Sequence, residues 1–237
     1  RLPSGIMGFL QRMAYRGMFG RAAAILPLDM RSGHAVGETS PQSHDKIRVM
    51  PNFIVCSSVP SKLSSDGSSG PLKIVFVGTL IREKNIHVLL ELARRVDGIS
   101  LTLVGHSSPQ MVAEINELIQ RDGLHDRLHL AGEMPNDEVR KFIAGQDVCI
   151  LPSFTEGFPM SVLEAMAIGL PIVASPAGAL PDMIDVPEGG FLVEPDDIEG
   201  FVEAMIKLRD DRPTAVAMGS YNRERALRDY DYDVVAL

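Results

Sequence analysis

The chain has 237 residues, of which 45% are hydrophobic, and it carries a formal net charge of −8. This is enough core-forming material for one large soluble α/β domain, or for one and a half domains. The two cysteines, Cys56 and Cys149, are too few for a disulfide framework and make a reducing cytoplasm the expected compartment. No apolar run reaches the roughly 18 residues that a membrane-spanning helix needs.

Charge is divided unevenly along the chain. Residues 1–50 hold seven Lys and Arg against three acids, a net of +4, which leaves −12 for the rest. Nonspecific nucleic-acid binding needs a basic stripe, so the acidic main body argues against a nucleic-acid partner. In the segment 8–21, Arg12 and Arg16 share a helical face. This segment either packs as a helix inside a domain or touches an anionic membrane surface at the inner face of the membrane.

The first 56 residues are expected to contain a helix, a strand at residues 22–26, a polar irregular stretch and a second strand at residues 46–50. The chain begins with Arg1 rather than Met, so we expect a fragment of a longer protein. Residues 57–71, SSVPSKLSSDGSSGP, hold seven serines, two glycines and two prolines, a composition typical of a flexible connection between domains.

From residue 72 onward, apolar runs typical of buried strands alternate with segments of helical periodicity. The predicted strands are 73–77, 100–104, 127–131 and 148–151, and the predicted helices are 85–96, 109–120, 136–144, 159–168 and 198–208. This alternation predicts an α/β fold with a Rossmann-like parallel sheet and helices on both faces. Ligands are then expected at the carboxyl ends of the strands.

The turn after the first of these strands, VGTLIREKN at residues 77–85, combines a glycine with two basic side chains. Gly78 lets a diphosphate approach the backbone closely, and Lys84 supplies a cation that stabilises negative charge on a departing diphosphate. The alternative is that Arg82 and Lys84 are solvated on either side of Glu83.

The segment 152–175 places two carboxylates, Glu156 and Glu164, around a predicted helix start. Ser161 and Glu164 are the polar residues of an otherwise apolar helix, so the helix is expected to be buried and Glu164 to need a partner. The backbone N–H groups of residues 158–161 are suited to an anion such as a diphosphate, and Glu164 to ribose hydroxyls. The alternative is a capping box with Ser161 as the N-cap and Glu164 at position N3.

The motif PSFTEGFPMSVLEA, residues 152–165, resembles the Glu-x7-Glu signature of the retaining glycosyltransferases of family 4, which have the GT-B architecture of two facing Rossmann-like domains. Other segments follow in the order of that family, among them GLPIVASPAGALPDMI at 169–184 and GGFLVEPDD at 189–197. The resemblance covers roughly residues 47–237. It implies that residues 1–56 are a remnant of the N-terminal acceptor domain, 57–71 a linker, and 72–237 the nucleotide-sugar-binding domain.

The resemblance implies transfer of a sugar from a nucleotide-diphosphate sugar donor to an acceptor, with retention of anomeric configuration. The acceptor is open among a polysaccharide, a lipid-linked molecule and a small molecule. No obligatory metal or other cofactor is expected, because the histidines at 87, 125 and 129 have no Cys or carboxylate clustered at metal-ligand spacing.

The resemblance also implies roles for single residues. Glu156 orients the donor sugar, or alternatively acts as a transient nucleophile. His106 contacts donor phosphate or sugar, or is a polar loop residue, and residues 130–134 line the nucleobase pocket through backbone groups. Thr79 stands where the family usually has Arg, so Arg82 is the expected substitute for that phosphate contact. The implied catalytic residues are Glu156 and Lys84, and the implied donor-binding set is Gly78, Thr79, Arg82, Lys84, His106, Met134, Glu156, Gly157, Phe158, Pro159, Met160, Ser161 and Glu164.

Two other functions fit parts of the sequence. A nicotinamide dehydrogenase fits the strand-helix alternation, but the turn at 77–85 has one glycine where the dinucleotide fingerprint needs three. A non-catalytic sugar-nucleotide-binding module, or one subunit of a split transferase, fits all the motifs. Turnover by the chain alone would separate the enzyme from the module.

Overall fold

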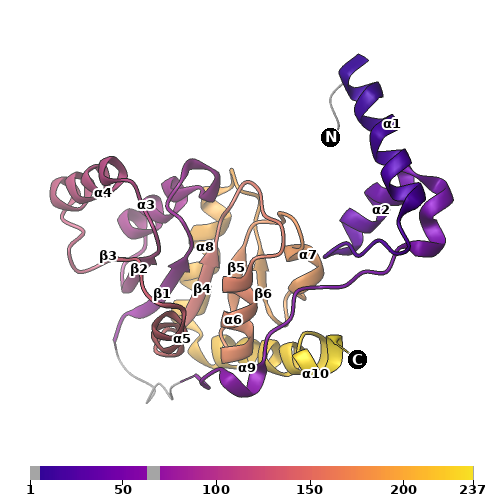
Figure 1. The fold of residues 1–237 in the computed structure, drawn as a ribbon. Helices are drawn as coiled ribbons and strands as arrows, with labels where there is room; N and C mark the ends of the chain where they lie inside the picture. The colour runs from indigo at the N-terminus through magenta and orange to yellow at the C-terminus, as the bar shows by residue number, and fades with distance from the viewer. Residues whose placement is uncertain (1–5, 63–69, 237) are drawn as a thin grey trace. The chain divides into compact units, whose positions relative to one another are not determined.

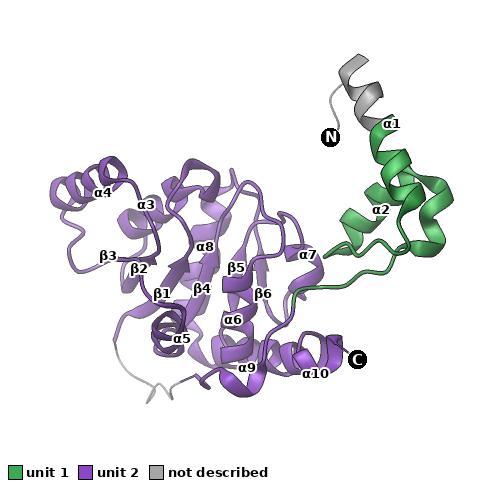
Figure 2. Cartoon of the chain, viewed as in Figure 1, with its two compact units in different colours: residues 1–52 green, residues 53–237 purple. Residues whose placement is uncertain are grey.

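The computed structural model describes residues 6–62 and 70–236, with side chains described from Met13 onward. The chain forms two compact units, residues 1–52 and 53–237 (Figure 2). Residues 63–69 of the predicted linker at 57–71 lie outside the described residues. Just before them, the Lys62 N–H donates to the Ile168 carbonyl at 2.9 Å, and the Lys62 ammonium lies 3.4 Å from Asp147. Lys62, in the predicted linker, is therefore bound to the rest of the second unit.

The first unit is helical. Its elements are α1 (Ile6–Arg21), α2 (Met30–Thr39) and the 3-10 helix η1 (Pro41–Lys46). The strands expected at 22–26 and 46–50 are reduced, within the described residues, to one parallel bridge between Ile25 and Ile47. The stretch expected to be irregular contains α2, because the Asp29 carboxylate caps this helix by accepting from the Ser32 N–H at 2.7 Å.

The second unit is built on a six-stranded parallel sheet (Figure 1). The strands are β1 (Leu72–Val77), β2 (Ile99–Val104), β3 (Leu128–Gly132), β4 (Val148–Leu151), β5 (Ile172–Ala174) and β6 (Gly190–Leu192). Their order is β3-β2-β1-β4-β5-β6, and every neighbouring pair is parallel. The chain therefore builds outward from β1 in one direction and then, from β4, in the other. The carboxyl ends of β1 and β4 flank this switch point, where open α/β sheets bind ligands.

Helices cover both faces of this sheet. They are α3 (Ile86–Arg95), α4 (Pro109–Asp122), α5 (Asn136–Ala144), α6 (Met160–Ile168), α7 (Leu180–Met183), α8 (Ile198–Asp210), α9 (Arg212–Asp229) and α10 (Tyr232–Val235), with the 3-10 helices η2 (Cys56–Ser58) and η3 (Arg82–Lys84). On one face α3 packs against α8, and on the other α5 and α9 pack against α6 (Figure 1). The predicted α/β Rossmann-like fold is confirmed.

The strands at the centre of the sheet are fully buried. β4 is buried at all four positions, and α6 is buried everywhere except at Met160, Ser161 and Glu164. Cys149 lies inside β4 as a free thiol, and burial raises its pKa to about 12. Cys56 is also free, and burial is the main cause that raises its pKa to about 12. Both thiols are therefore protonated at neutral pH.

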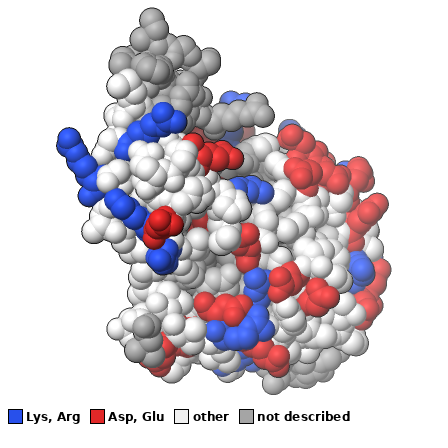
Figure 3. Space-filling model, turned by 90° about the vertical axis from the view of Figure 1, so that its right-hand side faces the viewer, with Lys and Arg blue, Asp and Glu red and all other residues white. Residues whose placement is uncertain are grey.

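Acidic groups are spread over the face drawn in Figure 3, with basic groups between them. No helix within the described ranges 6–62 and 70–236 combines the length and apolar character that crossing a membrane requires. The contact of residues 8–21 with a domain or a membrane surface stays a prediction.

The turns after β1 and β2 lie against each other. Gly105 follows β2 at a φ of +138°, and a Cβ built on it would lie 2.1 Å from the carbonyl oxygen of Gly78. Beside this contact, the Gly78 N–H donates to the Val104 carbonyl at 2.9 Å. The absence of a side chain at Gly105 thus lets the turn that carries Gly78 sit directly on β2.

We predict that Gly105→Ala destabilises the second unit by about 3 kcal/mol or more, because it adds a clash with backbone to an unfavourable backbone conformation. Urea unfolding of the whole chain measures this loss. Gly70→Ala is the matched control, since a Cβ there meets nothing within 4 Å. Equal unfolding midpoints for the two variants would contradict the account of this turn.

Candidate active site at the carboxyl edge of the sheet

The turn after β1 is fixed by two hydrogen bonds to neighbouring segments. Its Leu80 N–H donates to the His106 carbonyl at 2.8 Å, which joins it to the turn after β2. Asn85 adopts a left-handed conformation, with φ of 54°, at the start of α3. Its side-chain amide donates to the Pro195 carbonyl at 2.7 Å. Lys84 lies immediately before this anchor, so the backbone from which its side chain extends is held in place.

The loop after β4 is tied to the same turn. The Phe154 N–H donates to the Glu83 carbonyl at 2.9 Å. The Ser175 hydroxyl, at the end of β5, donates to the Ser153 carbonyl. The Ser153 hydroxyl is buried and has no hydrogen-bond partner among the described residues. The carboxyl ends of β1, β4 and β5 are therefore joined by hydrogen bonds that main-chain carbonyls accept.

An ion pair joins the two loops at the switch point. The Nζ atom of Lys84 lies 2.6 Å from Oε1 of Glu156, a distance that makes this both an ion pair and a hydrogen bond. The Glu156 side chain is 7% exposed and the Lys84 side chain 22% exposed. Within the described part of the chain, Glu156 has no other cation within 4 Å. The structure thus brings together the two predicted catalytic residues.

The backbone of Glu156 is held by the segment after β5. The Ala179 N–H donates to the Gly157 carbonyl at 2.8 Å. A Cβ built on Gly178, whose φ is +55°, would lie 2.3 Å from the Glu156 carbonyl oxygen. Glu156 can therefore change partners through its side-chain torsions, but its main chain has little room to move.

Helix α6 begins with no side-chain cap. Its N-cap is Pro159, and neither Ser161 nor any other side chain accepts from the first backbone N–H groups. The capping-box alternative is wrong, because the helix starts at Met160 and Glu164 lies one full turn inside it. Among the described residues, the N–H groups of Phe158, Met160 and Ser161 have no hydrogen-bond acceptor. Such a helix start attracts an anion.

Glu164 has a partner that the sequence did not indicate. Oε1 of Glu164 lies 3.7 Å from Nη1 of Arg140 on α5, and the two side chains are 18% and 29% exposed. Burial raises the pKa of Glu164, and the nearby Arg140 cation opposes this increase. No spacing along the chain connects positions 140 and 164, because the contact arises from the packing of α5 on α6.

Other predicted site residues lie around this centre. Gly78 and the exposed Thr79 follow β1 directly, and the half-buried Met134 follows β3. His106 is 69% exposed, with Nδ1 at 3.5 Å from Oε2 of Glu133. The ring of Phe158 is buried at 5.8 Å from the ring of Tyr230, so this residue offers its backbone rather than its side chain.

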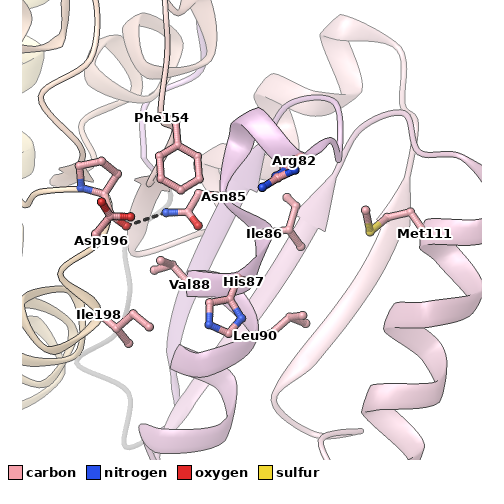
Figure 4. A pocket seen from close by; sticks show the side chains of 11 residues that line it. Arg82, Asn85, Ile86, His87, Val88, Leu90, Met111, Phe154, Asp196 and Ile198 are labelled. Carbon is pink, nitrogen blue, oxygen red and sulfur yellow. Dashed lines mark hydrogen bonds between the residues drawn. The ribbon is translucent and has the colours of Figure 1, made fainter.

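Arg82 lies beside a cavity. It lines this cavity, of about 550 Å³, beside the start of α3, together with Asn85, Phe154 and apolar side chains of α3, α4 and α8 (Figure 4). In the same view the dashed line marks the hydrogen bond of Asn85 that anchors the turn. Within the described residues Arg82 forms no ion pair, so its expected role as the second phosphate contact stays a prediction.

No group of three or more His, Cys, Asp and Glu residues that could hold a metal ion occurs within the described residues. The site described above contains the Glu156 carboxylate with its Lys84 cation, the open helix start and the Glu164–Arg140 pair. This combination suits an anionic ligand that also carries hydroxyl groups.

The sheet order and the site at its switch point define the class of protein. The second unit has the α/β Rossmann-like fold of GT-B glycosyltransferases. The family model of glycosyl transferases group 1 matches residues 63–225. The chain therefore belongs to the glycosyl transferases group 1 family, which excludes the dehydrogenase alternative.

Individual proteins agree with this assignment. The provisionally assigned colanic acid biosynthesis glycosyltransferase WcaL of Salmonella typhimurium is 25% identical over 231 residues, covering 93% of this chain and 56% of WcaL. Sucrose-phosphate synthase of Thermosynechococcus elongatus has a TM-score of 0.83 at 24% identity, covering 96% of this chain and 59% of that one. Anabaena HepE in complex with UDP has a TM-score of 0.83 at 20% identity, covering 95% of this chain and 65% of HepE. The chain spans about half the length of the curated relatives it matches.

We predict that Glu164→Gln raises the thermal stability of the free protein at pH 7. A carboxyl group whose pKa is raised by folding binds its proton more tightly in the folded state, so stability falls as pH rises from the ordinary value of 4.5 through the raised pKa. The glutamine side chain cannot ionise, so the variant does not lose stability in this way. Thermal unfolding between pH 4 and pH 8 should show a smaller decline for the variant, and a parallel decline in both proteins would contradict this reading of Glu164.

Proposed function

We propose that this chain is the donor-binding part of a retaining GT-B glycosyltransferase of family 4 and that it binds a nucleotide-diphosphate sugar where β1 and β4 end. The observation that carries the proposal is the part-buried Lys84–Glu156 pair, which lies in the loops around an α6 start without a side-chain cap. Residues 1–56 then belong to the acceptor domain, 57–71 to the connection and 72–237 to the donor domain.

The diphosphate is held by backbone and by one cation. Gly78 and Thr79 offer close approach to the main chain, and the N–H groups of Phe158, Met160 and Ser161 donate to phosphate oxygens. Lys84 neutralises the charge that develops on the diphosphate as its bond to the sugar breaks. These groups stabilise the leaving group without proton transfer, so no metal is assigned to the reaction.

The remaining groups recognise the nucleoside and the sugar. Glu164, oriented by Arg140, accepts hydrogen bonds from ribose hydroxyls, and residues 130–134 contact the base through their backbone. Glu156 accepts hydrogen bonds from the donor sugar and orients its anomeric carbon. In the retaining reaction the acceptor attacks the face from which the diphosphate leaves, and the departing phosphate takes the acceptor's proton.

HepE supports the ligand class, because its crystal structures contain UDP and UDP-glucose and it shares the fold of this chain. Calorimetric titration of the whole chain with UDP, GDP and ADP, first without metal and then with magnesium, tests the proposal. Saturable binding of one of the three without metal is the expected result. Binding of none of them would overturn the proposal.

We predict that Lys84→Met weakens nucleoside diphosphate binding by about 10- to 100-fold, because it removes one charge-assisted contact to phosphate. Lys141→Met is the matched control: the Lys141 side chain is 74% exposed and pairs with Asp137 on the surface of α5. Its affinity should stay within twofold of the wild type. Thermal unfolding shows whether the Lys84 variant keeps its fold, and equal affinities in two folded variants would exclude Lys84 from the site.

We predict that Glu164→Ala weakens nucleotide binding by about tenfold, through loss of the ribose contact. Glu156→Ala should lower sugar transfer by the complete enzyme more than it lowers donor binding, because its contact acts on the sugar near the reacting bond. Dissociation constants and kcat, measured side by side, separate the two effects. Wild-type donor affinity in Glu164→Ala would contradict the assignment of this residue.

A further inference from the structure

The cation assigned to the diphosphate is already neutralised by the protein. Nζ of Lys84 lies 2.6 Å from Oε1 of Glu156, and this carboxylate is 7% exposed. A buried carboxylate that loses its cation must gain hydrogen-bond donors or bear a large desolvation cost. A diphosphate that approaches Lys84 therefore competes with Glu156 for the same ammonium group.

We infer that Glu156 is a specificity-determining residue that favours the intact sugar nucleotide over the free nucleoside diphosphate by competing with the diphosphate for Lys84. The inference rests on the proposed function and concerns the same site. It adds a role for the ion pair: Glu156 weakens retention of the product as well as orienting the substrate.

The two kinds of ligand offer different groups to Glu156. A donor that still carries its sugar brings hydroxyl groups, which donate to the carboxylate and replace the hydrogen bond from Lys84. A nucleoside diphosphate brings acceptor oxygens and negative charge. It leaves Glu156 without a donor and adds repulsion between two anions around one cation.

The surroundings do not relieve this competition. Among the described residues, no second Lys or Arg lies within 4 Å of Glu156. Glu164, the carboxylate on α6, pairs with Arg140 at 3.7 Å and not with Lys84. The Glu156 main chain is fixed by Gly178 and by the Ala179 hydrogen bond, so the carboxylate moves only as far as its own torsions allow.

The selectivity follows the course of the reaction. Before transfer, sugar hydroxyls satisfy Glu156 while Lys84 faces the diphosphate. After transfer the sugar has left, Glu156 reclaims Lys84, and the diphosphate loses its cation. The Lys84–Glu156 ion pair, with its 2.6 Å contact, thus re-forms as the product departs.

The test is titration of the whole chain, wild type and Glu156→Gln, with UDP, GDP and ADP and with UDP-glucose, GDP-mannose and ADP-glucose. The amide keeps the shape of the side chain and removes its charge. We expect the nucleoside diphosphate to bind about tenfold more tightly to Glu156→Gln than to the wild type. Lys84 then no longer pairs with a carboxylate, and its ammonium is available to the diphosphate. The sugar nucleotide should bind no more tightly than before.

Glu164→Gln is the matched control, because it removes a carboxylate from the same site that pairs with Arg140 rather than Lys84. It should change the affinities of both ligands by the same factor and leave their ratio unchanged. Glu156→Asp, which retracts the carboxylate from Lys84 by one methylene, should shift the ratio in the same direction as Glu156→Gln but by less. This second variant keeps a charge opposite Lys84 and so serves if the amide destabilises the fold.

An unchanged ratio of the two dissociation constants in folded Glu156 variants, or weaker diphosphate binding, would overturn the inference while leaving the proposed function intact. Failure of the wild type to bind any of the six ligands would instead remove the proposed function, and this inference with it.

Discussion

The ion pair between Lys84 and Glu156 depends on one constraint, the reversal of strand order between β1 and β4. Every strand is parallel, so all carboxyl ends lie at one edge, and β1 and β4 are neighbours although 70 residues lie between Val77 and Val148 in sequence. That adjacency brings a lysine from one loop to 2.6 Å from a glutamate of the other. The open start of α6 follows directly from the second loop, so cation, carboxylate and backbone donors are placed by a single topological feature.

Helix α9 supports the segments that lead into the site. Asn222 on α9 donates from one amide to the carbonyl oxygens of Leu170 and Gly189, at 2.8 and 2.7 Å, which joins the segments entering β5 and β6. Tyr230 at the end of α9 packs against Phe158, beside the α6 start. The segment after α9 hydrogen-bonds through Tyr232 to Ile54. Residues far from the motif therefore determine how rigidly α6 presents its first N–H groups.

The parts of this architecture with a regular apolar pattern in the sequence could be predicted from it. The buried strand at 148–151 and the helix at 136–144 fall where the apolar pattern places them, and Glu156 and Lys84 were predicted from a local motif and a turn. Arg140 was not, because its pairing with Glu164 arises from helix packing. The structure of the first unit was predicted poorly. Its apolar run at 22–26 was expected to be a strand, but within the described residues it forms only one bridge. Helix α2 contains two glycines, which lower its helix propensity. The sequence therefore did not predict this helix, although Asp29 is a typical N-cap residue.

The central claim is that a nucleoside diphosphate binds at the edge where β1 and β4 end. Amide hydrogen exchange of the whole chain, with and without a saturating nucleoside diphosphate, measures this most directly. The account predicts that protection increases in residues 78–84 and 158–164 and stays unchanged at the opposite edge of the sheet. Protection that appears only elsewhere, or no change at these two segments under saturating ligand, would contradict it.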